Sequence, residues 1–134
     1  MGVEGALFSV GDTHAAMGDG EVCGTAVETA MDITARLSVR RDFSLRFPAF
    51  ELPAGQLAAA GASAHHVATG IGDDLFEACR EATRGLVDYI VERHGRDRQE
   101  AYAIASVASD LRVHEVVDAP NWVVGAFLPL AIFD

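Results

Sequence analysis

The spacing of hydrophobic residues along the chain gives its clearest signal near the middle. Apolar residues recur every three or four positions from Leu75 to Ile90, an Asp-Asp pair precedes them, and His94-Gly95 follows. This spacing places the apolar side chains on one face of a helix, and Asp and Gly are typical of its two ends. We predict a helix over 75–94.

A second helix and several strands are expected around it. Asp97 and Glu100 have the spacing of a capping box, so a shorter helix is predicted from there towards Ser109. Short apolar runs of strand length flank the helical pair at 64–71, 111–117 and 122–128. The order predicts an α+β fold, in which a mixed or antiparallel, sandwich-like β-sheet packs against a two-helix segment.

Extended patterns also occupy the N-terminal part. Ala6–Val10 runs into a Gly-Asp turn, and Val22–Val39 is rich in Thr, Val and Ile, which favour strands. Residues 42–50 alternate apolar and polar side chains until Pro48 ends the pattern. We expect strands in all three segments and a loop between the first two.

Composition narrows the classes of protein that this chain can belong to. Its 134 residues suggest a single domain over 1–134, and 20 acidic against 10 basic residues give a net charge of -10. An acidic surface disfavours nucleic acid and anionic membranes as partners. No basic leader is visible, and the most apolar segment is shorter than the roughly 20 residues of a membrane span. We expect a cytoplasmic protein that forms homo-oligomers.

All ten basic residues are Arg, and the sequence contains no Lys. A phosphate loop of the Walker type, a Schiff-base mechanism and the Cys-Glu-Lys and Ser-Ser-Lys amidase mechanisms all need a lysine, so this chain alone supports none of them. Its two cysteines, Cys23 and Cys79, are expected to be reduced and buried.

Candidate chemistry concentrates in residues 11–22, which hold three acids, one His and three Gly. Asp12 and His14 alternate, so on an extended chain they face the same side and could bind one metal ion. The alternative is an Asp that caps a turn and a His that packs on the backbone. Asp19-Gly20 is a common turn pair, so Asp19 can equally be structural.

Two further carboxylates and one thiol extend this set. Glu21 precedes the second extended segment and is the preferred general base, while Glu28 could join the site or form a surface ion pair. Cys23 could act as a nucleophile, but a small packed thiol is the simpler role.

The stretch Gly-Asp-x-His-Ala-x-x-Gly-Asp-Gly-Glu-Val, followed by Gly24-Thr25-Ala26-Val27-Glu28, resembles the acetamidase/formamidase family. The resemblance continues through nearly all of the chain and is to the family's C-terminal half. Its further blocks are Gly72-Asp73-Asp74-Leu75, Glu81-Ala82-Thr83-Arg84, Ser106 to Val113, Val117 to Asn121 and Leu128 to Phe133. Met17, where family members commonly have Gln, and residues 48–63 depart from the pattern.

The resemblance implies hydrolysis of short-chain aliphatic amides, such as formamide or acetamide, to a carboxylate and ammonia. Asp12 and His14 would hold a divalent metal ion, zinc or calcium, or orient water. Glu21 would be the base, with Asp19 or Glu28 in support. The partner would be the amide substrate together with further copies or a chain matching the family's N-terminal half. The alternative is a non-catalytic, truncated or split subunit that serves only in assembly.

Overall fold

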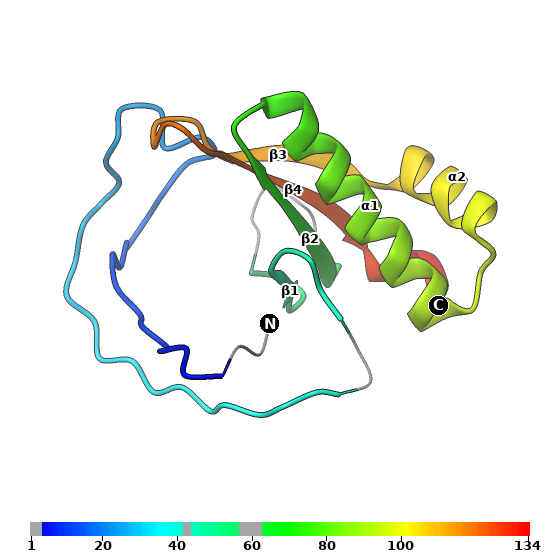
Figure 1. Cartoon of the computed structure of the whole chain (residues 1–134), viewed down its shortest axis with the longest axis horizontal. Coiled ribbons are helices and arrows are strands. Elements are labelled where there is room, and N and C mark those ends of the chain that lie inside the picture. The colour runs from blue at the N-terminus through cyan, green and yellow to red at the C-terminus, as the bar shows by residue number, and fades with distance from the viewer. Residues whose placement is uncertain (1–3, 42–43, 57–62) are drawn as a thin grey trace.

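The structure, a computed structural model, describes residues 4–41, 44–56 and 63–134 (Figure 1). Within the described residues, the strands and helices lie between Ala49 and Phe133. In order they are β1 (Ala49–Leu52), β2 (His65–Gly72), α1 (Leu75–His94), α2 (Arg98–Ala108), β3 (Asp110–Glu115), β4 (Trp122–Pro129) and the 3-10 helix η1 (Leu130–Phe133).

The four strands form one antiparallel sheet in the order β1-β2-β4-β3. Its centre is the pair β2 and β4, which run side by side over their whole length, from His65 opposite Pro129 to Gly72 opposite Trp122. Helix α1 crosses these two strands, and α2 packs beside α1 (Figure 1). The predicted α+β class, a sheet packed with a two-helix segment, is confirmed. In the described chain, the layer that packs on the sheet consists of helices and is not a second sheet.

Local signals set the limits of both helices. The Asp74 side chain accepts a hydrogen bond from the Glu77 amide at 2.8 Å, and Gly95 adopts the left-handed conformation that ends α1. Asp97 caps α2 by accepting from the amides of Gln99 and Glu100. Both helices therefore begin and end close to where the sequence predicts.

The core lies between α1 and the central strands. Leu86, Ile90, Val124 and Leu128 are its largest fully buried side chains, and each contributes roughly 1.5–3 kcal/mol through burial. The helix approaches the sheet so closely at Gly70 that a Cβ there would lie 2.0 Å from the Ala78 carbonyl oxygen. This position requires Gly, and the close approach fixes how α1 sits on β2.

The N-terminal strand predictions are wrong. Residues 4–41, which we call the arm, run as an open loop beside the sheet (Figure 1), and their only strand-type pairing within the described chain is an isolated bridge between His14 and Glu28. An extended segment becomes a strand only when a neighbour satisfies its backbone groups. Ala6–Val10 and Val22–Val39 meet no such neighbour over their length in the described residues.

Two smaller expectations also need correction. The strand expected at 42–50 begins instead at Ala49, because Pro48 cannot donate a ladder hydrogen bond; residues 44–48 are irregular, and 42–43 lie outside the described residues. Cys23 is exposed rather than buried, since the arm does not pack over it, and Cys79 is half-buried. Both thiols are free. No helix in the described part of the chain is long and apolar enough to cross a membrane.

Candidate metal and catalytic site

Two segments of the arm meet in a short antiparallel contact that builds the site. The Ala15 amide donates to the Val27 carbonyl at 2.8 Å, and the Thr29 amide donates to the Thr13 carbonyl at 3.0 Å. These bonds flank the bridge and set His14 directly opposite Glu28. Two residues far apart in the arm are thus brought face to face by backbone pairing.

Three ligand-type side chains converge there. His14 Nε2 lies 3.1 Å from Glu28 Oε2 and 3.2 Å from Asp12 Oδ1. One ligand atom from each of these residues falls within 4.8 Å of the other two. Glu21 Oε1 lies slightly farther, 4.0 Å from the same nitrogen. The structure therefore gathers Asp12, His14, Glu28 and Glu21 around one point.

Backbone conformation aims two of the carboxylates. Asp12 and Glu21 have φ angles of 56° and 44°, and they are the residues other than Gly with positive φ in the described chain. Asp tolerates this region, but it is uncommon for Glu, and strained residues of this kind cluster at functional sites. The Glu21 turn is held by hydrogen bonds from its amide to Gly18 O and from the Gly24 amide to Glu21 O.

Glu28 is oriented by its neighbours in the arm. Its Oε1 accepts hydrogen bonds from Thr25 Oγ1 at 3.1 Å and from the Ala26 amide at 3.2 Å. The second oxygen, Oε2, is the one that faces His14. Such partners fix the direction of a metal-ligating carboxylate.

The charges around His14 act on its protonation. Burial lowers the pKa of the imidazole, but the neighbouring carboxylates of Asp12, Glu28 and Glu21 outweigh burial, so the pKa is raised. Although the two carboxylates are close, Nε2 has no well-aligned hydrogen-bond acceptor among the described residues. Close approach without mutual hydrogen bonds suits groups that share a third partner, and imidazole and carboxylates are residue types that could hold a cation.

Exposure differs strongly across the cluster. The side chains of His14 and Glu21 are 14% and 12% exposed, whereas those of Glu28 and Asp12 are 51% and 78% exposed. The imidazole and Glu21 therefore form the covered side of the site, and the other two carboxylates form its open side. The open side of the cluster faces solvent.

Asp19 does not join this group. Its Oδ2 accepts a hydrogen bond from Arg112 Nε at 2.8 Å, and next to it Gly20 exchanges backbone hydrogen bonds with His114 and Val116. These contacts tie the arm to the end of β3. No local sequence pattern predicted the contact with Arg112, because Asp19 and Arg112 lie 93 positions apart. Cys23 Sγ lies 3.5 Å from the Thr25 carbonyl oxygen.

The sequence profile described as the Acetamidase/Formamidase family matches residues 1–134. Two solved structures are similar to this chain. An acetamidase from Yersinia enterocolitica is 29% identical with a TM-score of 0.69, and the match covers 90% of this chain and 33% of that one. An acetamidase from Bacillus halodurans is 28% identical with a TM-score of 0.71, covering 90% and 37%. No curated protein matches the sequence. The chain thus spans about a third of the length of these solved relatives.

Proposed function

The chain belongs to the acetamidase/formamidase family, and from this premise we propose that it carries the hydrolytic site of an amidase acting on short-chain aliphatic amides. The convergence of Asp12, His14 and Glu28 within 4.8 Å of one another, with Glu21 beside them, is the observation that carries the proposal. The products would be a carboxylate and ammonia. Formamide and acetamide are the substrates to test first.

In this proposal Asp12, His14 and Glu28 hold a divalent metal ion. An imidazole together with carboxylates favours zinc over calcium, because calcium prefers ligand sets made only of oxygen. When bound, the ion would polarise the amide carbonyl and lower the pKa of water. Glu28 is assigned here as a ligand rather than as a supporting base, since its Oε2 is the carboxylate oxygen nearest to His14 Nε2.

Glu21 is the general base of the proposed reaction. Its carboxylate is mostly covered and lies 4.0 Å from His14 Nε2, close enough to accept a proton from a water molecule placed at the cluster. The same group can then return the proton to the leaving nitrogen, so that ammonia departs neutral. Asp19, which is paired with Arg112, positions the loop and does not take part in the proton transfer.

The amidase also needs polypeptide that this chain does not supply. Support comes from the share of the solved relatives that it covers, about a third, and from the large apolar side chains of the arm, such as Leu7 and Val39, which are 96% and 76% exposed. A companion chain corresponding to the rest of the family's length would pair with these segments and close the open side of the site. Assembly of several copies is the other way to cover them. A cytoplasmic location is proposed with this function.

Ammonia release from formamide and acetamide tests the proposal. The chain is loaded with zinc and assayed alone and with a companion chain of the family. We expect Glu21→Gln to lower the rate constant by about 100-fold or more. Asp32→Asn is the matched control, because Asp32 is an exposed acid of the same arm and should leave the rate unchanged.

A bound metal is measured in the same preparations. Zinc at one per chain, lost in His14→Ala and retained in Asp32→Asn, supports the ligand set. Calcium that survives His14→Ala would instead indicate a structural ion in the acidic loop. Zinc binding with no ammonia release in either assembly would favour the second candidate, a non-catalytic assembly module.

A further inference from the structure

The turn that carries Glu21 has little packing of its own. The Glu21 amide donates to the Gly18 carbonyl at 3.3 Å, and the Gly24 amide donates to the Glu21 carbonyl at 2.8 Å. In the described chain, a Cβ at Gly18 or Gly24 would meet no atom beyond its chain neighbours within 4 Å. Glu21 nevertheless keeps a φ angle of 44° and a side chain that is only 12% exposed. A strained conformation of this kind persists only when surrounding structure imposes it, so contacts outside the turn must hold Glu21.

Gly20, the residue before Glu21, makes such a contact with the edge strand β3. Its amide donates to the His114 carbonyl at 3.2 Å, and its carbonyl accepts from the Val116 amide at 3.1 Å. A Cβ at Gly20 would lie 3.0 Å from Val22 Cγ1, and the φ angle of 87° favours glycine there. The backbone of the turn is therefore fixed against the sheet one residue before the Glu21 carboxylate.

Arg112, in β3, holds the same turn through a side chain. Its Nε donates to Asp19 Oδ2 at 2.8 Å, and its Cζ lies 4.8 Å from the centroid of the Phe127 ring. Ala126 and Leu128 pack into the core under α1, so Phe127, between them in β4, points to the other face of the sheet. The ring belongs to a residue that is 6% exposed, and the Arg112 side chain is 23% exposed. A guanidinium restricted by a buried ring loses less entropy on pairing than a free surface arginine.

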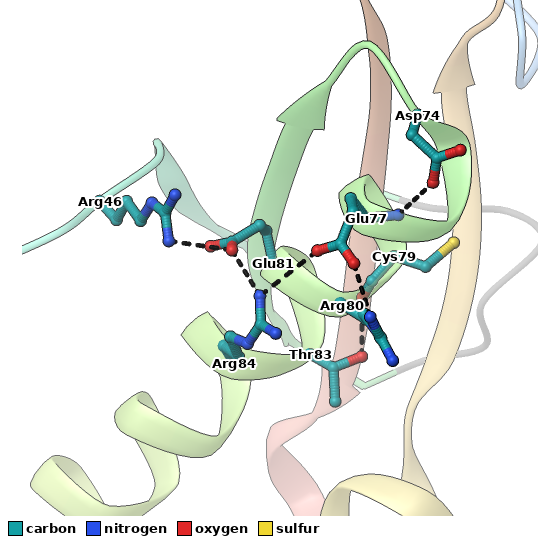
Figure 2. Close-up of polar contacts among 8 residues, drawn as sticks. All are labelled: Arg46, Asp74, Glu77, Cys79, Arg80, Glu81, Thr83 and Arg84. Atoms are coloured by element: carbon teal, nitrogen blue, oxygen red, sulfur yellow. Dashed lines mark hydrogen bonds and ion pairs between the residues drawn. The ribbon is translucent and has the colours of Figure 1, made fainter.

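Arg80 makes the same two kinds of contact in a different setting. Its Nη1 lies 2.6 Å from Glu77 Oε1 (Figure 2), and its Cζ lies 4.7 Å from the centroid of the Phe76 ring. All three residues belong to α1, and Phe76 is 66% exposed. That pair joins residues one turn apart on one helix, whereas Arg112 and Asp19 join the sheet to the arm. Arg80 is therefore the matched control for Arg112.

We propose that Arg112 is a positioning residue of the candidate site, which holds Glu21 beside His14 through Asp19 and Gly20. The ion pair fixes one residue of the turn, the backbone bonds of Gly20 fix the next, and the Glu21 side chain follows directly. The importance of this for catalysis rests on the proposed function, in which Glu21 is the base. A misplacement of about 1 Å at a reacting group costs up to about 100-fold in rate.

The ligand-type residues are held by other contacts. The bridge that sets His14 opposite Glu28 is formed within the arm, by the backbone bonds between Ala15 and Val27 and between Thr13 and Thr29. Loss of the Arg112 side chain should therefore release Glu21 and leave this bridge in place. Such a separation distinguishes a positioning role from general support of the fold.

NMR spectra of the full chain test the position of Glu21 directly. A nuclear Overhauser cross-peak between the Glu21 side chain and the His14 ring is expected in the unmodified chain, because Glu21 Oε1 lies 4.0 Å from His14 Nε2. It should be lost in Arg112→Gln and in Asp19→Ala and kept in Arg80→Gln. Absence of the cross-peak from the unmodified chain, its persistence in both arm-releasing variants, or its equal loss in Arg80→Gln would overturn the proposal. Thermal unfolding verifies that each variant folds, and Asp19→Ala changes the arm alone.

Ammonia release gives the second test, in the zinc-loaded preparations described above. Arg112→Gln should lower kcat about tenfold or more, with KM and the zinc content nearly unchanged, whereas Arg80→Gln should change none of them. Adding Arg112→Gln to Glu21→Gln should cause no further loss, because both changes act on one group. Losses that multiply would overturn the proposal. If the unmodified chain releases no ammonia, the proposed function fails, and the cross-peak still decides whether Arg112 holds Glu21.

Discussion

Large apolar side chains occur both in the arm and in residues 63–134, but the two regions differ in how deeply these side chains are buried. Leu86, in α1, is fully buried between helix and sheet, whereas Leu37, in the arm, is 69% exposed. The arm nevertheless holds the metal and catalytic candidates, while the packed region holds the core. The packed core and the candidate site therefore lie in separate segments of the chain.

The contrast between the two leucines gives the largest expected effect. Leu86→Ala removes a fully buried side chain and leaves a cavity, so the free energy of unfolding should fall by about 3 kcal/mol. Leu37→Ala should change it by less than about 0.5 kcal/mol, because that side chain is already exposed. Chemical denaturation of both variants measures the difference, and equal losses would mean that the arm packs in solution.

One glycine in each region gives the same comparison, because substitution by alanine adds a methyl group. A methyl group at Gly70 would meet the backbone of α1 at 2.0 Å, so Gly70→Ala must push the helix from the sheet and cost about 3 kcal/mol. At Gly11, in the arm, an added methyl group would meet no atom within 4 Å, and the φ angle there is not left-handed. Gly11→Ala should leave the midpoint of thermal unfolding unchanged, and a loss similar to that of Gly70→Ala would show that the arm is packed.

The histidines of the two regions should respond to pH in opposite directions. Burial lowers the pKa of His66 to about 4, with smaller contributions from His94 and Arg93. Between pH 6.5 and 4, His66 is therefore protonated in the unfolded chain but neutral in the native protein. The free energy of unfolding falls as the pH falls through this range. Allowing for partial solvent screening, the loss should be about 2 kcal/mol. Denaturation at several pH values, with His66→Phe as the non-titrating comparison, measures it; parallel curves would contradict the assignment.

His14 provides the smallest effect and has the opposite sign. Its pKa is raised, so the contact with Asp12 and Glu28 is strongest below pH 6.5 and is lost as the pH rises through the native pKa. An NMR titration should place the His14 midpoint above 6.5, and Glu28→Gln should lower that midpoint. Asp32→Asn serves as the control in the same arm. A midpoint below 6.5 in the unmodified chain would contradict the electrostatic argument.

Local patterns were sufficient for the helices and for the central strands. The spacing from Leu75 to Ile90 and the caps at Asp74 and Asp97 act within one or two turns, and the structure places α1 and α2 accordingly. The apolar runs that became β2 and β4 were also found, since a strand buried between neighbours needs little more than length and apolar content. Alternation brought Asp12 and His14 to one side of the chain.

The remaining features depended on partners far along the chain. An extended pattern is the same whether or not another strand lies beside it, so Val22–Val39 was predicted as a strand although it meets no ladder within the described residues. The pairing of Asp19 with Arg112 and the position of Glu28 opposite His14 likewise follow from contacts between segments that are distant in the sequence.

The sequence by itself determined the helices, the central strands, the α+β class and the residue types at the site, because periodicity and capping act through neighbours three or four positions away. The tertiary structure alone decided which carboxylates surround His14 and that Asp19 pairs with Arg112 instead. Convergence of side chains in space is set by chain pairing and close packing, and neither is encoded in the spacing of residues along the sequence.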